Sequence, residues 1–170
     1  MVTTQPKPKA LSAAQAARKT AIEIVATNRK ARYEYHILET FEAGLVLVGT
    51  EVKSLRAKMV QLLDSYATIV RGEAWIYHLH ISPFEKGNQF NHEPLRPRKL
   101  LLHKSEIQRL IGKTQEQGLT VVPLQIYFKG GRAKLELAIA KGKKLYDKRA
   151  DQASRDAKRE AERAVRVSAD

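Results

Sequence analysis

The stretch from Leu119 to Ala140 constrains the fold of this chain more than any other, because two alternating segments flank a pair of glycines. Gly130-Gly131 supplies the two positive φ angles that a tight primed turn requires. Apolar side chains alternate at Val122, Leu124, Ile126 and Phe128, and then at Ala133, Leu135, Leu137 and Ile139. The pattern predicts a β-hairpin formed by residues 119–129 and 132–140, with each strand burying one face.

Two further strand pairs are predicted upstream. Residues 33–39 and 44–49 read as strands joined by a turn at 40–43, and residues 65–70 and 74–81 pair around Arg71-Gly72. In the last of these strands the apolar and aromatic residues alternate at Trp75, Tyr77, Leu79 and Ile81, which predicts a single apolar face.

Helices are predicted at two places between the strands. Thr50 can cap a short helix whose Val52, Leu55 and Met59 face the core. A second helix is predicted over residues 105–117, with Gly118 as its C-terminal cap. Six short antiparallel strands in one small domain suggest a closed or partly closed barrel. The predicted fold class is therefore mainly β with flanking helices.

Charge separates the chain into three regions. The 170 residues include 31 Lys and Arg and 18 Asp and Glu, for a net charge of +13. Most of this excess lies in the two ends, so we predict a flexible basic N-terminal arm (1–25), a barrel domain (26–140) and a basic tail (141–170). The tail carries no apolar stripe and is expected to be disordered alone and helical on a polyanionic surface. Nucleic acid is the expected partner.

Composition excludes several classes of protein. The absence of cysteine excludes a disulfide scaffold, a zinc ribbon, an iron–sulfur site and a thiol nucleophile. The longest apolar runs, such as residues 45–48, are too short to span a bilayer, and no apolar stretch near the start resembles a signal peptide. We therefore expect a soluble cytoplasmic protein with no membrane partner.

Signals for catalysis are weak. His78 and His80 share one face of a predicted strand and His92 follows in a loop, so three imidazoles could hold a metal ion. This leaves open a metal-dependent RNA-processing enzyme. There is no carboxylate pair, no nucleophile elbow and no glycine-rich phosphate loop, and no cofactor is predicted.

Basic and aromatic residues form a more coherent pattern. Three cations and a ring lie together in the segment Asn28, Arg29, Lys30, Ala31, Arg32 and Tyr33. Another basic cluster, Arg96, Arg98 and Lys99, leads toward His103. Guanidinium groups bind phosphate oxygens, and tyrosine and histidine rings stack on unpaired bases. The interleaving predicts RNA binding, and a general structured-RNA or rRNA binder remains an alternative.

A series of motifs in order resembles the SsrA-binding protein family, also called small protein B. They are residues 28–32 (NRKAR), 40–44 (TFEAG), 49–57 (GTEVKSLRA), 64–66 (DSY), 80–83 (HISP), 98–103 (RKLLLH), 118–120 (GLT) and 140–149 (AKGKKLYDKR). The resemblance implies a six-stranded, oligonucleotide-binding (OB)-like barrel, monomeric and without enzymatic activity. It implies binding to the tRNA-like domain of transfer-messenger RNA and delivery of that RNA to stalled ribosomes for trans-translation.

The resemblance also implies roles for particular residues. Glu42, Lys99, Leu101 and His103 would lie in the surface that holds the tRNA-like domain, with Glu42 accepting hydrogen bonds from RNA or orienting a cation such as Lys99. Burial of Leu101 in the core is an equal alternative. The further RNA-binding residues would be Asn28, Arg29, Lys30, Arg32, Lys53, Arg56 and Arg98.

The family tail enters the vacant messenger channel near the decoding centre of the stalled ribosome. The residues implied there are Tyr33, Lys141, Gly142, Lys143, Lys144, Asp147, Lys148 and Arg149. Two positions depart from the family pattern: Tyr33 replaces a frequent histidine, and Lys58-Met59 replaces a usual glycine–lysine pair.

Overall fold

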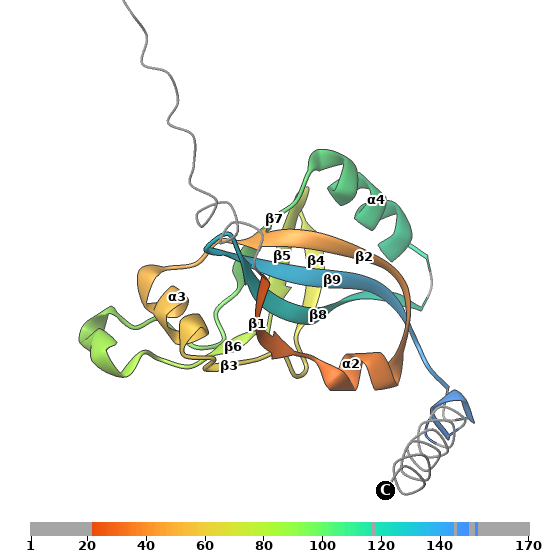
Figure 1. Ribbon diagram of the computed structural model, residues 1–170. Helices are drawn as coiled ribbons and strands as arrows, with labels where there is room; N and C mark the ends of the chain where they lie inside the picture. The colour runs from red at the N-terminus through yellow and green to blue at the C-terminus, as the bar shows by residue number, and fades with distance from the viewer. Residues whose placement is uncertain (1–21, 117, 145, 150–151, 153–170) are drawn as a thin grey trace, which may run out of the picture.

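The computed structural model describes residues 22–116, 118–144, 146–149 and 152, and Figure 1 shows its strands wrapped into a barrel with helices around it. The elements in chain order are β1 (Ile22–Thr27), α2 (Arg29–Glu34), β2 (Tyr35–Leu45), α3 (Gly49–Arg56), β3 (Val60–Gln61), β4 (Tyr66–Val70), β5 (Glu73–Tyr77), β6 (His80–Ile81), the 3-10 helix η1 (Glu85–Phe90), β7 (Arg98–Leu101), α4 (Lys104–Thr114), β8 (Leu119–Lys129) and β9 (Arg132–Gly142).

Six antiparallel strands close into a ring. Hydrogen bonding runs in the order β8, β4, β5, β7, β2 and β9, and β9 pairs again with β8. The predicted six-stranded, OB-like barrel is therefore confirmed. Its strands differ from the three predicted hairpins, because β2 and β7 take the place of the first predicted pair. Strand β1 adds to the edge of β8 beside β4, and the short pair β3–β6 lies apart from the ring.

The hairpin β8–β9 has the predicted turn. Gly130 and Gly131 adopt φ angles of 58° and 77°, and Lys129 pairs with Arg132. The register shifts between Pro123 and Gln125, however, so the predicted single face of β8 is wrong. Ile126 and Phe128 lie in the barrel core, whereas Val122 and Leu124 lie in a separate outer cluster.

Two apolar clusters hold helices α4 and α2 against the barrel. The inner cluster fills the barrel and includes Leu110 of α4, so that helix packs against the barrel core. The outer cluster joins Ala31 of α2 to Val122 and Leu124 of β8, so α2 covers part of the outer face of the sheet. Both helices are held by apolar burial, the dominant favourable contribution to folding.

Strand β2 joins the first predicted strand, the predicted turn and the start of the second predicted strand (44–49), whose residues 46–48 lie in no strand and whose Gly49 begins α3. Phe41 and Ala43 are buried, while Thr40 and Glu42 point outward, so the period of two continues through the predicted turn. The start of the predicted first strand, residues 33–34, belongs instead to helix α2.

The barrel domain is longer than residues 26–140 at both ends. Strand β1 begins at Ile22, inside the predicted arm, because it pairs with the second half of β8. Strand β9 continues to Gly142, which pairs with Tyr35. Residues 1–21 of the predicted arm, and residues 145, 150–151 and 153–170 of the predicted tail, lie outside the described residues.

Strand β5 faces the opposite way from the prediction. Ala74 and Ile76 are buried, whereas Trp75 and Tyr77 are only half-buried on the outer face. His78 then adopts a φ of 57°, which breaks the strand and resets its alternation. The reset explains why Leu79 and Ile81 are buried although Trp75 and Tyr77 are not.

The two predicted helices are present with shifted ends. Helix α3 begins at Gly49, and the Glu51 carboxylate, rather than Thr50, caps it by accepting a hydrogen bond from the Val48 N–H at 2.9 Å. Helix α4 ends at Thr114, before the predicted end at 117, and Gly118 then takes a φ of 78°.

Candidate nucleic-acid interface

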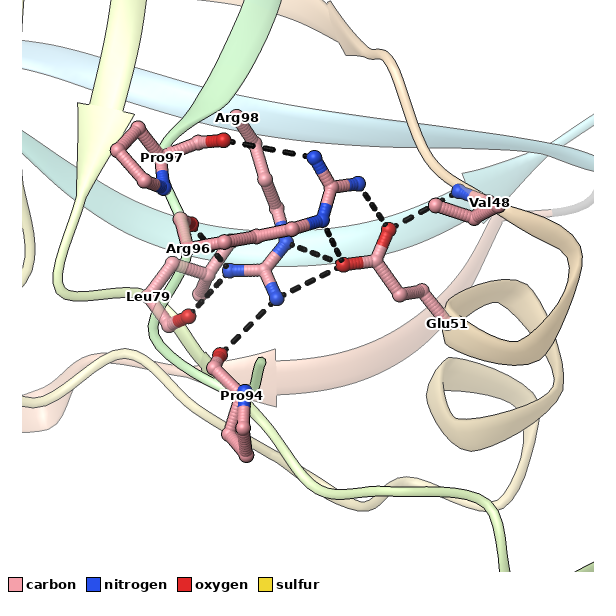
Figure 2. A network of polar contacts seen from close by, with 7 residues as sticks. All are labelled: Val48, Glu51, Leu79, Pro94, Arg96, Pro97 and Arg98. Carbon is pink, nitrogen blue, oxygen red and sulfur yellow. Dashed lines mark hydrogen bonds and ion pairs between the residues drawn. The ribbon is translucent and has the colours of Figure 1, made fainter. Parts of the chain in front are cut away.

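Arg98, a predicted RNA-binding residue, lies in the interior of the protein. It has no exposed surface and binds Glu51 at 2.9 Å, the Leu79 carbonyl at 2.5 Å and the Pro94 carbonyl at 3.0 Å (Figure 2). Arg96 binds the same carboxylate from the side exposed to solvent, at 2.5 and 2.8 Å. Direct contact between Arg98 and RNA was therefore wrongly predicted: the guanidinium holds the loop before β7 against α3.

The charges in this network support one another. Burial alone would raise the pKa of Glu51, but hydrogen bonds from Arg96 and from the Val48 N–H, with the charge of Arg98, hold that pKa below its usual value. Burial lowers the pKa of Arg98, and Glu51 opposes that effect. Glu51 is charged at neutral pH because its pKa is lowered, and Arg98 is charged because an arginine is not deprotonated in proteins.

Asn28 is also structural. Its side chain accepts a hydrogen bond from the Ala31 N–H at 3.0 Å, which caps α2, and donates to the carbonyls of Leu62 and Pro123, each at 3.2 Å. The side chain is buried and thereby ties α2 to two distant segments. Asn28 can support an RNA surface by fixing α2, whose Arg29 and Arg32 are exposed.

Glu42 lies at the centre of an ion-pair cluster on the outer face of β2. Its carboxylate accepts hydrogen bonds from the Tyr127 hydroxyl at 2.6 Å and from Lys129 at 2.9 Å, and it pairs with Lys134 at 3.2 Å. The cations that Glu42 orients are thus Lys129 and Lys134. The suggested partner, Lys99, pairs instead with Glu73.

The carboxylate of this cluster is charged at neutral pH. The Tyr127 hydrogen bond, followed by that of Lys129, lowers the pKa of Glu42 to about 2. Burial, followed by Glu42, raises the pKa of Tyr127. At neutral pH the Glu42 carboxylate therefore holds two ammonium groups at fixed places on the sheet, with Glu136 beside it on β9.

An apolar groove adjoins the cluster. Leu101, for which core and surface were equal alternatives, has 55% of its surface exposed and pairs with Gly44 of β2. The groove beside it has a volume of about 380 Å³ and extends to Arg132 and Lys134 of the β8–β9 hairpin. His103 is exposed at the start of α4, two residues beyond Leu101. Leu101, Arg132 and Lys134 therefore border one groove, and His103 follows in the chain outside its lining.

The remaining predicted cations are distributed over two helices. On α3, Lys53 lies 5.5 Å from the centre of the Phe84 ring and Arg56 lies 5.9 Å from that of Phe128. On α2, Lys30 binds Asp64 at 3.2 Å, and this hydrogen bond raises the pKa of Lys30. All three cations are exposed enough to reach a phosphate.

The predicted tail is anchored where it leaves the barrel. The Lys143 N–H donates to the Glu34 carbonyl at 2.8 Å, and its ammonium group donates to the Arg32 carbonyl at 3.3 Å. Asp147 accepts from the Lys144 N–H at 3.2 Å and lies 3.5 Å from the imidazole of His36. Residues 146–149, which include Lys148 and Arg149, are helical, and Lys141 and Gly142 belong to β9. Tyr33 is half-buried in α2 beside this anchor.

The structure does not assemble the three histidines proposed as a metal site. His78 packs edge-on against Tyr66, His80 lies in β6, and His92 lies at a groove beside α3. Among the described residues there is no group of three His, Cys, Asp or Glu side chains that could hold a metal ion. Within the same residues, no helix has the length and hydropathy needed to cross a membrane.

The cluster contains three residues that were not selected from the sequence: Tyr127, Lys129 and Lys134. The hairpin alternation already places Lys134 outward, but which carboxylate it meets depends on the pairing of β9 with β2. A closed barrel brings these distant strands together, and alternation within a single hairpin carries no such information.

Comparisons with known proteins agree on one family. The family model described as "SmpB protein" matches residues 25–167. The chain is 67% identical over 145 residues to an SsrA-binding protein of Desulforudis audaxviator, covering 85% of this chain and 95% of that one. It is 64% identical over 146 residues to an SsrA-binding protein of Pelotomaculum thermopropionicum, covering 86% and 95%.

A solved structure gives the same result. The chain is similar, with a TM-score of 0.61 and 54% identity, to a protein in a structure described as "tmRNA-SmpB: a journey to the center of the bacterial ribosome". The match covers 71% of this chain and 85% of the other.

Proposed function

Because this chain belongs to the SmpB protein family, we propose that it binds the tRNA-like domain of transfer-messenger RNA and delivers that RNA to stalled ribosomes for trans-translation. The relatives are named for binding SsrA, and the similar solved structure concerns transfer-messenger RNA and the bacterial ribosome. The net charge of +13 suits both RNA partners.

The observation that carries the proposal is the Glu42 cluster beside Leu101. Two lysines held by one carboxylate can meet phosphates at fixed positions, and the exposed leucine offers apolar contact to a base or ribose. Fixed positions favour one RNA shape over another, whereas mobile surface lysines bind any RNA. The proposed role is therefore that of an adaptor that recognises a folded RNA, and not that of an enzyme.

A second part of the proposal concerns the tail. Residues 141–149 carry five cations and leave the barrel beside α2, at a place fixed by Lys143. We propose that the tail continues from there into the empty messenger channel, whose phosphates attract it and which a messenger already present would occupy.

Binding to the tRNA-like fragment, compared with an ordinary tRNA across a salt series, tests the adaptor role. Each phosphate contact should contribute about 0.7–0.9 to the slope of log affinity against log salt. A preference for the tRNA-like fragment that persists at high salt supports the proposal. Equal binding of both RNAs, lost equally with salt, would instead identify a general RNA binder.

The variant Glu42→Gln tests the cluster itself. Removing the charge releases Lys129 and Lys134, and we expect affinity for the tRNA-like fragment to fall about tenfold, since charge-assisted hydrogen bonds contribute roughly 1.5–3 kcal/mol. Ordinary tRNA should lose little. Glu39→Gln removes an equal charge from the same strand, where Glu39 pairs with Arg109, and serves as the matched control. Equal losses in the two variants would contradict the assignment.

A further inference from the structure

A strip of aromatic rings lies on the outer face of β4 and β5, away from the Glu42 cluster. Tyr66 of β4 pairs directly with Tyr77 of β5, and their rings stack with centroids 5.6 Å apart and planes inclined at 16°. Trp75 lies two residues before Tyr77 and therefore on the same face. We call Tyr66, Tyr77, Trp75 and the adjoining His78 the aromatic strip.

The strip is on the surface although aromatic rings usually contribute to a core. Ala67, Ala74 and Ile76 fill the interior from the same two strands, which leaves the rings outside. Tyr66 is 41% exposed, His78 is exposed, and Trp75 and Tyr77 are half-buried. Exposed aromatic rings that are not needed for packing are typical of binding surfaces.

His78 takes a strained conformation to join the strip. Its φ of 57° lies in the left-handed region, which is costly for residues with a side chain. The imidazole meets the Tyr66 ring edge-on, with centroids 5.6 Å apart. Glycine would adopt this backbone without strain, so the histidine ring is present at a cost in stability.

A cavity and a cation adjoin the strip. Tyr66 and Tyr35 line a cavity of about 340 Å³, together with Lys30, Glu34 and Asp64. The cavity is open to solvent and combines ring surfaces with one ammonium group and the two carboxylates that it pairs with. The rings can bind the face of a base, and the charged groups can hydrogen-bond its edge.

The strip and Glu42 itself lie on strands that are far apart in the ring, although the Glu42 cluster also includes Tyr127 and Lys129 of β8, the strand that pairs with β4. In the ring β8–β4–β5–β7–β2–β9, strand β4 is three steps from β2 in either direction (Figure 1). An RNA that contacts Glu42 therefore need not cover Tyr66.

We propose that the aromatic strip is a second RNA-binding site, which stacks unpaired bases of a single-stranded RNA segment. Stacking needs only the face of a base, so this site would accept many sequences but not a duplex, whose bases are already stacked. The proposal concerns residues other than the Glu42 cluster and another form of RNA, although Trp75 pairs with Lys99 of β7 at the border between the two surfaces.

The test uses the full-length protein and its single tryptophan. A short oligoadenylate RNA is titrated while Trp75 fluorescence is recorded, in the presence and absence of saturating tRNA-like fragment. We expect quenching by the single strand in both conditions, and none by an RNA duplex of the same length. Absence of quenching by the single strand, or equal quenching by the duplex, would overturn the proposal.

Single substitutions test which rings of the strip bind the RNA. Tyr66→Ala should weaken oligoadenylate binding about tenfold, because removing one ring on which a base stacks lowers affinity by about that factor. Tyr66→Phe keeps the ring and should retain the affinity. Leu95→Ala removes an apolar side chain that is 49% exposed outside the strip and should change nothing. Affinity for the tRNA-like fragment should be the same in all three variants, so a failure here is distinct from a failure at Glu42.

The variant His78→Gly tests whether misfolding, and not loss of a ring, explains weaker oligoadenylate binding. Glycine suits the observed φ, so this variant keeps the backbone while it removes the imidazole. We expect weaker oligoadenylate binding at undiminished thermal stability. Unchanged binding in both Tyr66→Ala and His78→Gly would contradict the proposal.

Discussion

At the residue scale, Lys58 shows how the chain keeps a turn without the residue that best fits it. The resemblance to the family places a glycine there, and Lys58 adopts a φ of 58°. The Lys58 N–H binds the Leu55 carbonyl at 2.9 Å, and the Met59 N–H binds the Ser54 carbonyl at 3.0 Å. These two hydrogen bonds are those of a Schellman motif, which ends α3 with a left-handed residue. The turn is thus preserved with a strained lysine.

Replacing Lys58 with glycine should therefore stabilise the protein. The left-handed conformation costs an L-residue about 1–2 kcal/mol, and the extra freedom of glycine in the unfolded chain offsets roughly half of that. We expect a gain of about 0.5–1 kcal/mol, measured as a higher urea midpoint at an unchanged m-value. Lys58→Ala is the control: it removes the charge but keeps the strain, and a gain of the same size there would refute this explanation.

Single residues also show what a sequence can and cannot assign. The segment RKLLLH predicted an RNA surface, and the structure places Leu101 outward but Arg98 fully inward. Both residues belong to the short strand β7, whose residues alternate between the core and the surface. Pro97 and the basic cluster before it obscure this alternation in the sequence. Burial of an arginine requires a distant carboxylate, and Glu51 on α3 cannot be identified as that partner from spacing alone.

At the scale of elements, local sequence signals predicted the hairpins, whereas pairing between distant strands determined where the other strands begin and end. Gly130-Gly131 fixed the β8–β9 turn, because glycine is required for two successive positive φ angles. Residues 40–43 contain no glycine, and β9 pairs with them throughout, so the predicted turn became part of β2. The bulge near Pro123 and the break at His78 shift the alternation by a residue, which no periodic pattern anticipates.

The Glu51 network is the element-scale contact that joins α3 to β7. Arg98→Met would leave Glu51 with Arg96 as its remaining cation and should cost about 3 kcal/mol, at the lower end for breaking a buried ion pair. Urea unfolding measures this loss. RNA affinity of the folded protein should not change, since Arg98 is buried.

Arg132→Met is the matched comparison. Arg132 is exposed at the start of β9 and borders the groove beside Leu101. We expect near-normal stability and weaker binding to the tRNA-like fragment, the opposite of Arg98→Met. If Arg98→Met weakened RNA binding without loss of stability, the structural role assigned to Arg98 would be refuted.

At the scale of the whole molecule, three separate surfaces share one rigid barrel. The Glu42 cluster, the aromatic strip and the root of the tail are carried by different strands of the closed ring and by α2. Closure holds these surfaces at constant distances from one another, which an adaptor between two large RNAs requires. The net charge indicated such partners from the sequence, whereas the arrangement of the surfaces depends on the order of strands.

Truncation separates the roles of barrel and tail. A chain ending at Lys144 keeps all of β9 and the contacts of Lys143 with α2, and should bind the tRNA-like fragment as the full chain does. Peptide tagging on stalled ribosomes should be lost, because the rest of the tail is absent. Parallel loss of both activities would contradict this division, and retention of tagging would show that the tail is dispensable.

The closure of the ring also dictates when the protein can fold during its own synthesis. Tyr35 pairs with Gly142, so the first and last strands of the ring are neighbours in space and nearly the whole domain apart in sequence. While the chain is still being made, β2 and β4 have unpaired edges, because both of their later partners, β9 and β8, have not emerged. The pairs among β4, β5, β7 and β2 can form earlier, but closure of the ring awaits β9, and such a large separation in sequence favours slow folding.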